Sequence, residues 1–354
     1  MDSKASKSQG VVNPFYYIDG VTINPADNSN PSGTIQIKRP YAILQNATEW
    51  DLAILRATYP LNNLPLGICP LRIGLTVNST PMSCSMTKAG STQTTYVTWV
   101  SEFKDQPTPT STQVQDFSSK YYWYTTVATL LSCFNTALST CATNQSATKT
   151  PFLTFDSQSS LFSLFLPQTD FGSTASTPIT LSWNSLWSQY FPNFCSTNSG
   201  GQVTLVIPTG ANTQTVGGTV YWVMTQEAPN TTQWDSLSCI QMNTDLGIVP
   251  EDTATNTSAI VNSSSAVSPQ ITDILIDSGT GQLSGGTRSG IAEYLPVSLP
   301  RWINLRTTTF TSFNIFISWQ DKYGNTYPLT LPPGTQTTMK LLFRHRSSRQ
   351  GDTY

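Results

Sequence analysis

The feature that most constrains the fold of this chain is a long series of short segments in which apolar and polar residues alternate. Alternation puts the apolar side chains of an extended segment on one face, which is typical of a half-buried β-strand. Pro, Gly, Asn and Ser bound these segments and favour turns between them. The segments include TIQIKRPYAI, LRIGLTV, TTYVTWV, GQVTLVIP, TVYWVMTQ, SLSCIQMNTDLGI, QITDILID and FNIFISW. We therefore predict an all-β sandwich with insertions.

One segment has helical periodicity instead. In TTVATLLSCFNTALSTCAT, residues 125–143, apolar side chains recur every three or four residues, at Val127, Leu130, Leu131, Phe134 and Leu138. This spacing predicts a single amphipathic helix whose apolar stripe packs on a sheet. FLTFDSQSSLFSLFL, which follows, predicts a β-hairpin. LSWNSLWSQYF fits a short helix, and TEWDLAILRATYP fits either a strand or a short helix.

Charged residues are unusually rare in this chain. They make up 11% of it, against about 25% in an average globular protein. A surface with so few charges suits a protein whose outside is largely covered by neighbouring molecules. The net charge of -2 argues against a general nucleic-acid binder, which would be strongly basic.

The residues that carry most enzyme and metal chemistry are sparse. Six cysteines lie far apart without a C-x-x-C pair, and the chain has one histidine, so we predict buried reduced thiols and no metal site. We find no nucleophile elbow, phosphate loop or dinucleotide fingerprint, and we predict neither catalysis nor a cofactor. We also find no run of about 18 apolar residues, so we expect no membrane span. The cysteines are Cys69, Cys84, Cys133, Cys141, Cys195 and Cys239.

Three groups of side chains are candidates for recognition. The apolar island NPFYYIDGVTI is a short edge strand, a loop pinned by its aromatic residues, or an arm that docks Phe15, Tyr16 and Tyr17 onto another subunit. Nine tryptophans also permit a receptor- or glycan-binding protein of the lectin type. Its exposed aromatic platform would use the tryptophans in the less regular segments, Trp183, Trp187 and Trp234. The third group is basic and lies near the C-terminus, at Arg344, His345, Arg346 and Arg349.

The C-terminal region and several upstream segments resemble the penton (vertex) proteins of virophages, polinton-like viruses and adintoviruses. The turn DKYG precedes a strand that ends in LLFR, as in that family. QIKRPYAILQNATEWDLAILRATYPLNNLP is similar to its opening strand pair, and IQMNTDLG to its central strand. YYWYTTVATLLSCFNTALS, with Asn135, Ala137 and Leu138, resembles its helix. In this order the segments span roughly residues 33 to 346.

The resemblance implies a single jelly roll that forms homopentamers at icosahedral five-fold vertices and contacts double-jelly-roll major capsid proteins. It implies a virion protein, made and assembled inside the host cell. We expect an N-terminal arm at residues 1–31, a jelly-roll domain at 32–346 and a basic tail at 347–354. Insertions are expected at about 170–235 and 247–270. Arginine pairs well with phosphate, so the basic C-terminal residues either face packaged nucleic acid or an acidic internal protein, or merely solubilise a frayed end.

Overall fold

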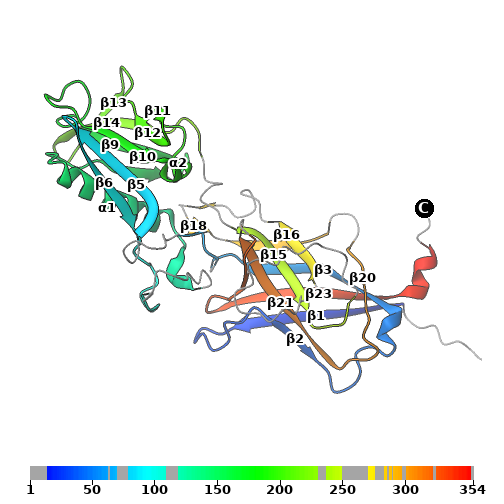
Figure 1. The fold of residues 1–354 in the computed structure, drawn as a ribbon. Coiled ribbons are helices and arrows are strands. Elements are labelled where there is room, and N and C mark those ends of the chain that lie inside the picture. Colours follow the sequence, from blue (N-terminus) through cyan, green and yellow to red (C-terminus); the bar gives the residue numbers. More distant parts are fainter. Residues whose placement is uncertain are drawn as a thin grey trace, which may run out of the picture. The chain divides into compact units, whose positions relative to one another are not determined.

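The chain divides into two compact units (Figure 1). Unit 1 comprises Met1–Asn63, Ser238–Thr280 and Gly290–Tyr354, and unit 2 comprises Leu64–Leu237 and Gly281–Ser289. The computed structural model describes residues 14–62, 64–69, 79–108, 119–229, 237–248, 270–275, 283–284, 287–288, 290–296, 300–321 and 324–351.

Unit 1 is a sandwich of two antiparallel sheets. The first sheet has the order β1-β23-β3-β19, with β20 also paired to β3, and the second has the order β16-β15-β21-β2, with β22 paired to β21. The first sheet consists of β1 (Phe15–Asn24), β3 (Trp50–Pro60), β19 (Ile291–Tyr294), β20 (Ile303–Asn304) and β23 (Thr335–His345). The second consists of β2 (Ile35–Lys38), β15 (Leu237–Thr244), β16 (Gln270–Leu275), β21 (Ser312–Asp321) and β22 (Thr326–Pro328).

The order of the strands identifies unit 1 as a jelly roll. Without the short strands β20 and β22 and the hairpin that belongs to unit 2, eight strands remain among the described residues of unit 1. Numbered along the chain, they run 1-8-3-6 in one sheet and 2-7-4-5 in the other. This interleaving of two four-stranded sheets is the jelly-roll topology. The single jelly roll predicted from the sequence is therefore confirmed.

Alternating side chains fill the space between the two sheets. Phe313, Ile315, Ile317 and Trp319 of β21 are buried, whereas Phe316, between them, is exposed. The segment TEWDLAILRATYP, which fitted a strand or a helix, forms β3 because three strands, β23, β19 and β20, pair with it. The described residues also form three short 3-10 helices. Two lie in unit 1, Ala47–Glu49 and Arg346–Gly351, and one lies in unit 2, Lys120–Tyr122.

Unit 2 has two larger sheets, two short strand pairs and both α-helices of the described residues. One sheet has the order β11-β12-β10-β5-β6, with β5 (Ser79–Lys88), β6 (Ser91–Thr98), β10 (Thr180–Asn184), β11 (Ser196–Ser199) and β12 (Gln202–Leu205). The other has the order β13-β14-β9-β8, with β8 (Phe152–Asp156), β9 (Leu161–Pro167), β13 (Asn212–Val216) and β14 (Thr219–Thr225). Two short pairs are β4 (Gly67–Ile68) with β7 (Trp123–Tyr124) and β17 (Leu283–Ser284) with β18 (Thr287–Arg288).

Helix α1 (Val127–Asn144) confirms the helix predicted from the periodic stripe. Thr126 caps its first turn, since the Thr126 hydroxyl accepts a hydrogen bond from the backbone N–H of Thr129. The buried side of α1 includes Leu130, Phe134 and Leu138. It packs on strands of both sheets of unit 2, β5, β6 and β8. The second helix, α2 (Ser185–Tyr190), is the short helix expected in LSWNSLWSQYF.

Several expected boundaries differ from the structure. The segment inserted into the jelly roll begins at Leu64, far before the insertion expected at about residue 170. Residues 15–24 of the expected N-terminal arm form β1, which matches the edge-strand alternative. Cys195 is exposed, so the prediction of six buried thiols is wrong at that position. The predicted strand at residues 71–77 and the insertion at about 247–270, apart from its first and last residues, lie outside the described residues.

Within the part of the chain described above, neither helix is both long and apolar enough to cross a membrane.

Candidate functional site

Strand β1 presents a row of apolar side chains to solvent. Along β1 the residues alternate between buried and exposed, and Phe15, Tyr17, Val21 and Ile23 are 38–54% exposed. We call these four side chains the β1 outer face. Tyr16 lies on the other side of the strand, half-buried, with its ring centroid 6.3 Å from that of Phe343. Of the predicted docking residues, Phe15 and Tyr17 are therefore on this surface and Tyr16 is not.

The β1 outer face lies at the edge of its sheet. β1 pairs along all its residues with β23, from Phe15 opposite Arg344 to Asn24 opposite Thr335, and among the described strands it forms one of the two edges of that sheet. An edge strand offers unpaired backbone groups, and several apolar side chains on such a strand favour association with another protein surface. Asp19, exposed in the same row between Tyr17 and Val21, is directly opposite Lys340 of β23, and Lys340 lies 5.9 Å from the Tyr17 ring centroid. The exposed side of β1 is therefore mainly apolar, with a pair of opposite charges within it that can orient a partner.

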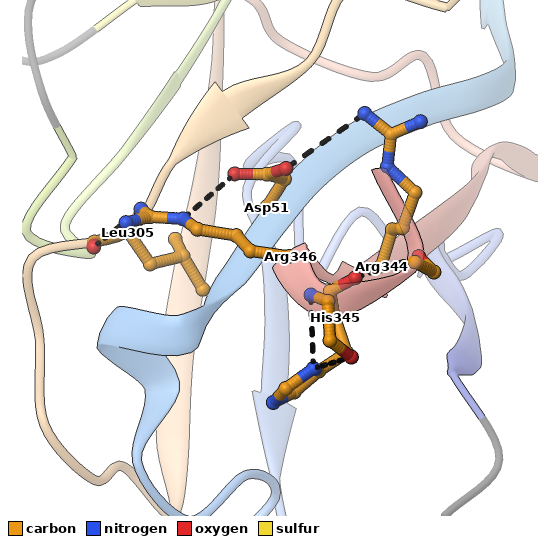
Figure 2. A network of polar contacts seen from close by, with 7 residues as sticks. Asp51, Leu305, Arg344, His345 and Arg346 are labelled. Carbon is orange, nitrogen blue, oxygen red and sulfur yellow. Dashed lines mark hydrogen bonds and ion pairs between the residues drawn. The ribbon is translucent and has the colours of Figure 1, made fainter. Parts of the chain in front are cut away.

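A second site joins the end of β23 to β3. Asp51 of β3 is fully buried and lies between two arginines (Figure 2). One Asp51 carboxylate oxygen accepts a hydrogen bond from Arg346 Nε at 3.2 Å, and the other lies 3.8 Å from Arg344 Nη2. Strand pairing explains the arrangement, because Arg344 is directly opposite Asp51 in the register of β23 with β3. We call these three side chains the Asp51 cluster.

Neighbouring groups hold the Asp51 cluster in place. The Arg344 guanidinium lies over the Trp302 ring, 4.0 Å from its centroid, and Arg346 Nη2 donates to the Leu305 carbonyl at 3.4 Å. The pair formed by His345 Nε2 and Glu49 Oε2, 3.1 Å apart, adds a second link between β23 and the segment before β3. The histidine ring meets Trp50 edge-on, with centroids 5.1 Å apart.

The basic residues near the C-terminus therefore belong to the folded jelly roll. Arg344 and His345 are the last two residues of β23, and Arg346 opens the 3-10 helix that follows. Arg349 lies in that helix too. The alternative of a frayed end is wrong for Arg344, His345 and Arg346, because ion pairs and strand pairing hold them. A signal for this was present in the sequence, since Asp51 interrupts the apolar run of TEWDLAILRATYP and needs a buried partner.

The exposed aromatic platform predicted for a glycan-binding protein is not formed by Trp183 and Trp187. They are 1% and 0% exposed, and their rings stack with centroids 5.8 Å apart. Phe134 of α1 and Phe191 pack against Trp187, so all four rings belong to the core of unit 2. The prediction is wrong for these two tryptophans because α2 folds its Trp187 inward over β10. Trp234 lies outside the described residues.

Comparisons with known proteins agree with the fold. The chain is similar to a protein chain in the cryo-EM structure of the Sputnik virophage, with a TM-score of 0.77 and 21% identity over 96% of this chain and 99% of that one. It is also similar to the mavirus penton protein in its crystal structure, with a TM-score of 0.64 and 16% identity over 93% of this chain and 99% of that one. A search of curated protein sequences finds no match.

The family comparison covers the whole jelly roll and the unit inserted into it. The model of the Sputnik minor capsid protein V18/19 family matches residues 15–345, from the first residue of β1 to the last residue of β23. Such a match covers well over half of the chain. The chain therefore belongs to the family of the Sputnik minor capsid protein V18/19 and is a structural protein of the viral capsid.

Proposed function

We propose that the chain forms a homopentamer that occupies the five-fold vertices of an icosahedral capsid. The observation that carries this proposal is the likeness of the chain, over 93% of its length, to the mavirus penton protein. Membership of a minor capsid protein family supports it, because vertices need few copies compared with the faces of a shell. The protein has a structural role in this proposal and no catalytic one.

The β1 outer face is our candidate for one side of each subunit contact. A closed ring uses heterologous contacts, in which one surface of each subunit meets a different surface of the next. The β1 outer face supplies exposed aromatic and branched apolar side chains, such as Tyr17 and Val21, that suit the centre of such a contact. The low charge of the chain supports the same view, since charged residues are depleted at interface cores.

The proposal includes a second kind of contact and a place of assembly. A vertex ring must also meet the surrounding shell, and we propose that its partner there is a double-jelly-roll major capsid protein. Assembly then takes place inside the host cell. We propose no contact of Arg344 and Arg346 with packaged nucleic acid or an acidic internal protein, because Asp51 already engages both guanidinium groups.

The mass of the recombinant protein in solution tests the ring. We expect a species near five times the chain mass of 38.7 kDa by light scattering, with five-fold particles in negative-stain images. A stable trimer would contradict the proposal and favour a receptor-binding or major-shell jelly roll. A monomer that forms five-fold rings only when mixed with the major capsid protein would support it.

Substitutions on the β1 outer face test the contact surface. Tyr17→Asp and Val21→Asp each put a charge into the proposed contact, and removal of an interface anchor costs about 2 kcal/mol or more, which is roughly a 30-fold loss of affinity. We expect both variants to fold and to lose the pentamer at concentrations where the wild type keeps it. Phe316→Asp is the matched control, because Phe316 is 39% exposed on β21 of the other sheet. Equal loss of the pentamer in all three variants would reject the β1 outer face.

A further inference from the structure

Unit 2 has a surface pocket between the end of β14 and the loop that precedes β13. Its volume is about 330 Å³, at the lower end of the range of about 300–1,000 Å³ for small-molecule sites. The pocket therefore fits a small ligand or the end of a larger one. The described residues that line it include Cys195, Pro208, Thr209, Asn212, Val223 and Glu227.

Backbone hydrogen bonds hold the walls of this pocket in place. Asn212, the first residue of β13, is directly opposite Val223 of β14. A turn closes the loop before β13, since the backbone N–H of Ala211 donates to the Pro208 carbonyl at 3.1 Å. Gly210 in this turn has a φ of 81°, a conformation that glycine adopts without strain. The pocket is therefore preformed, as most small-molecule sites are.

Three polar side chains of the pocket have no hydrogen-bonding partner within the described part of the chain. They are the Thr209 hydroxyl, the Asn212 amide and the Glu227 carboxylate, and all three residues are exposed. A hydroxyl and an amide can each donate and accept hydrogen bonds, whereas a carboxylate only accepts them. Thr225, which also lines the pocket, differs because its hydroxyl bonds that of Ser163 at 2.8 Å. The pocket thus offers free donors and free acceptors to a ligand.

The charge of the pocket narrows the class of ligand. Residues 171–226 contain no Asp, Glu, Lys, Arg or His, so Glu227 is the only charged residue among the described residues that line the pocket. An anion such as a phosphate, a sulfate or an acidic sugar would meet this negative charge without a cation to offset it. The same lining residues include no aromatic side chain on which a nucleobase could stack. A neutral ligand rich in hydroxyl groups is what remains.

We propose that this pocket of unit 2 binds a neutral sugar, such as the one at the end of a glycan chain. The sugar hydroxyls donate to the Glu227 carboxylate and bond the Asn212 amide and the Thr209 hydroxyl, while the C–H groups of the ring contact Pro208 and Val223. Glycan binding would thus use a pocket of the inserted unit and not an aromatic platform. The proposal adds a binding role to the structural one and does not depend on the pentamer.

Cys195 provides a direct readout of the pocket, because it lines the pocket and is exposed, whereas the other five cysteines are buried. The full-length protein is first screened against neutral oligosaccharides of galactose, mannose, fucose and N-acetylglucosamine, and against the same oligosaccharides carrying sialic acid or sulfate. We expect selective binding of a neutral oligosaccharide. At about ten times its dissociation constant, that oligosaccharide should slow the labelling of Cys195 by iodoacetamide about tenfold, because only the free protein reacts.

Substitutions in the pocket and beside it complete the test. Asn212→Ala and Glu227→Ala each remove a hydrogen-bonding side chain, and we expect each to weaken binding of the oligosaccharide about tenfold. Gln214→Ala is the matched control and should bind as the wild type does. Gln214 is an exposed amide on the same face of β13 as Asn212, but it is not among the described residues that line the pocket. All three residues are exposed, so the variants should keep the thermal midpoint of the wild type.

Three results would overturn the proposal. The first is binding of acidic glycans alone or of no glycan. The second is a neutral glycan that binds all three variants equally and leaves the labelling of Cys195 unchanged, because the sugar site then lies elsewhere. The third is protection of Cys195 by a pool of peptides but by no sugar, which would assign the pocket to a protein partner. None of these results bears on the mass of the ring, so the two proposals fail separately.

Discussion

Asp51 is the residue on which the end of the jelly roll most depends. Its carboxylate is fully buried and faces the guanidinium groups of Arg344 and Arg346. Asp51→Asn keeps the shape of the side chain but leaves two positive charges close together without their counter-charge. We expect the variant to lose about 3–5 kcal/mol of unfolding free energy, measured by guanidinium denaturation.

Glu49 is the control for Asp51, because it is also acidic and contacts the same end of β23. Glu49 pairs with His345, but its side chain is 57% exposed, and exposed pairs contribute little. Glu49→Gln should therefore change the unfolding free energy by less than about 1 kcal/mol. Equal effects of the two substitutions would show that burial does not explain the contribution of Asp51 to the unfolding free energy.

Asp170 makes the stability of unit 2 depend on pH in the acid range. Burial raises the pKa of its carboxyl, but hydrogen bonds from the backbone N–H groups of Thr148 and Lys149 and from the Thr169 hydroxyl outweigh burial, and the pKa falls below its usual value of 3.8. A lowered pKa in the folded state adds stability above pH 3.8 that is lost as the pH falls through the folded pKa. We expect Asp170→Asn to destabilise unit 2 by about 1–3 kcal/mol at pH 7.

The pH dependence supplies the check on Asp170. The difference in unfolding free energy between wild type and Asp170→Asn should shrink when denaturation is repeated at successively lower pH below 3.8. A difference in unfolding free energy that stays constant across this pH range would mean that the ionised Asp170 carboxylate does not stabilise unit 2.

At the scale of the element, Gly20 shows how closely β1 approaches its opposite sheet. A Cβ atom at Gly20 would lie 2.7 Å from the Ile35 Cγ2 atom of β2, which is closer than real contacts allow. Gly20→Val would overpack this point, and we expect a loss of about 1–3 kcal/mol, measured by thermal denaturation of unit 1. Asp19→Ala, one position away on the exposed side of β1, is the control and should change stability by about 0.5 kcal/mol or less.

Some elements could be predicted from the sequence and others could not, for a physical reason. Helix α1 was predictable because its period of three to four apolar residues lies within one continuous segment. β21 was predictable for the same reason, with a period of two. By contrast, β3 has apolar residues on both faces, so its pattern fits a helix as well, and only pairing with β23 and β19 decides. The burial of Trp187 likewise depends on Phe134, about 50 positions earlier in the chain.

At the scale of the whole molecule, the division into two units could not be predicted from the sequence. Residue composition changes little at Leu64, where the chain leaves the jelly roll, because both units are built from short, Thr- and Ser-rich strands. The boundary follows from pairings between distant strands, such as Ile291 of β19 opposite Pro60 of β3. Local patterns contain no information about such pairings, and so the insertion was expected about a hundred residues too late.

Each unit has its own apolar core, so we expect calorimetry to resolve two unfolding transitions. Gly20→Val should lower only the transition of unit 1. Asp170→Asn should lower only that of unit 2. A single transition, with equal calorimetric and van't Hoff enthalpies, would show that the two units unfold as one.

The pairing of the first strand with the last has a consequence during synthesis on the ribosome. Phe15 of β1 pairs with Arg344 of β23, so the first sheet of unit 1 stays open until the chain has left the exit tunnel as far as Arg344. The main segment of unit 2, Leu64–Leu237, emerges about a hundred residues earlier and can fold first, before the β17–β18 hairpin joins it. Until β23 has been synthesised, β1 is an unpaired strand with exposed apolar side chains. In this state it can pair with β1 of another nascent chain on the same polysome.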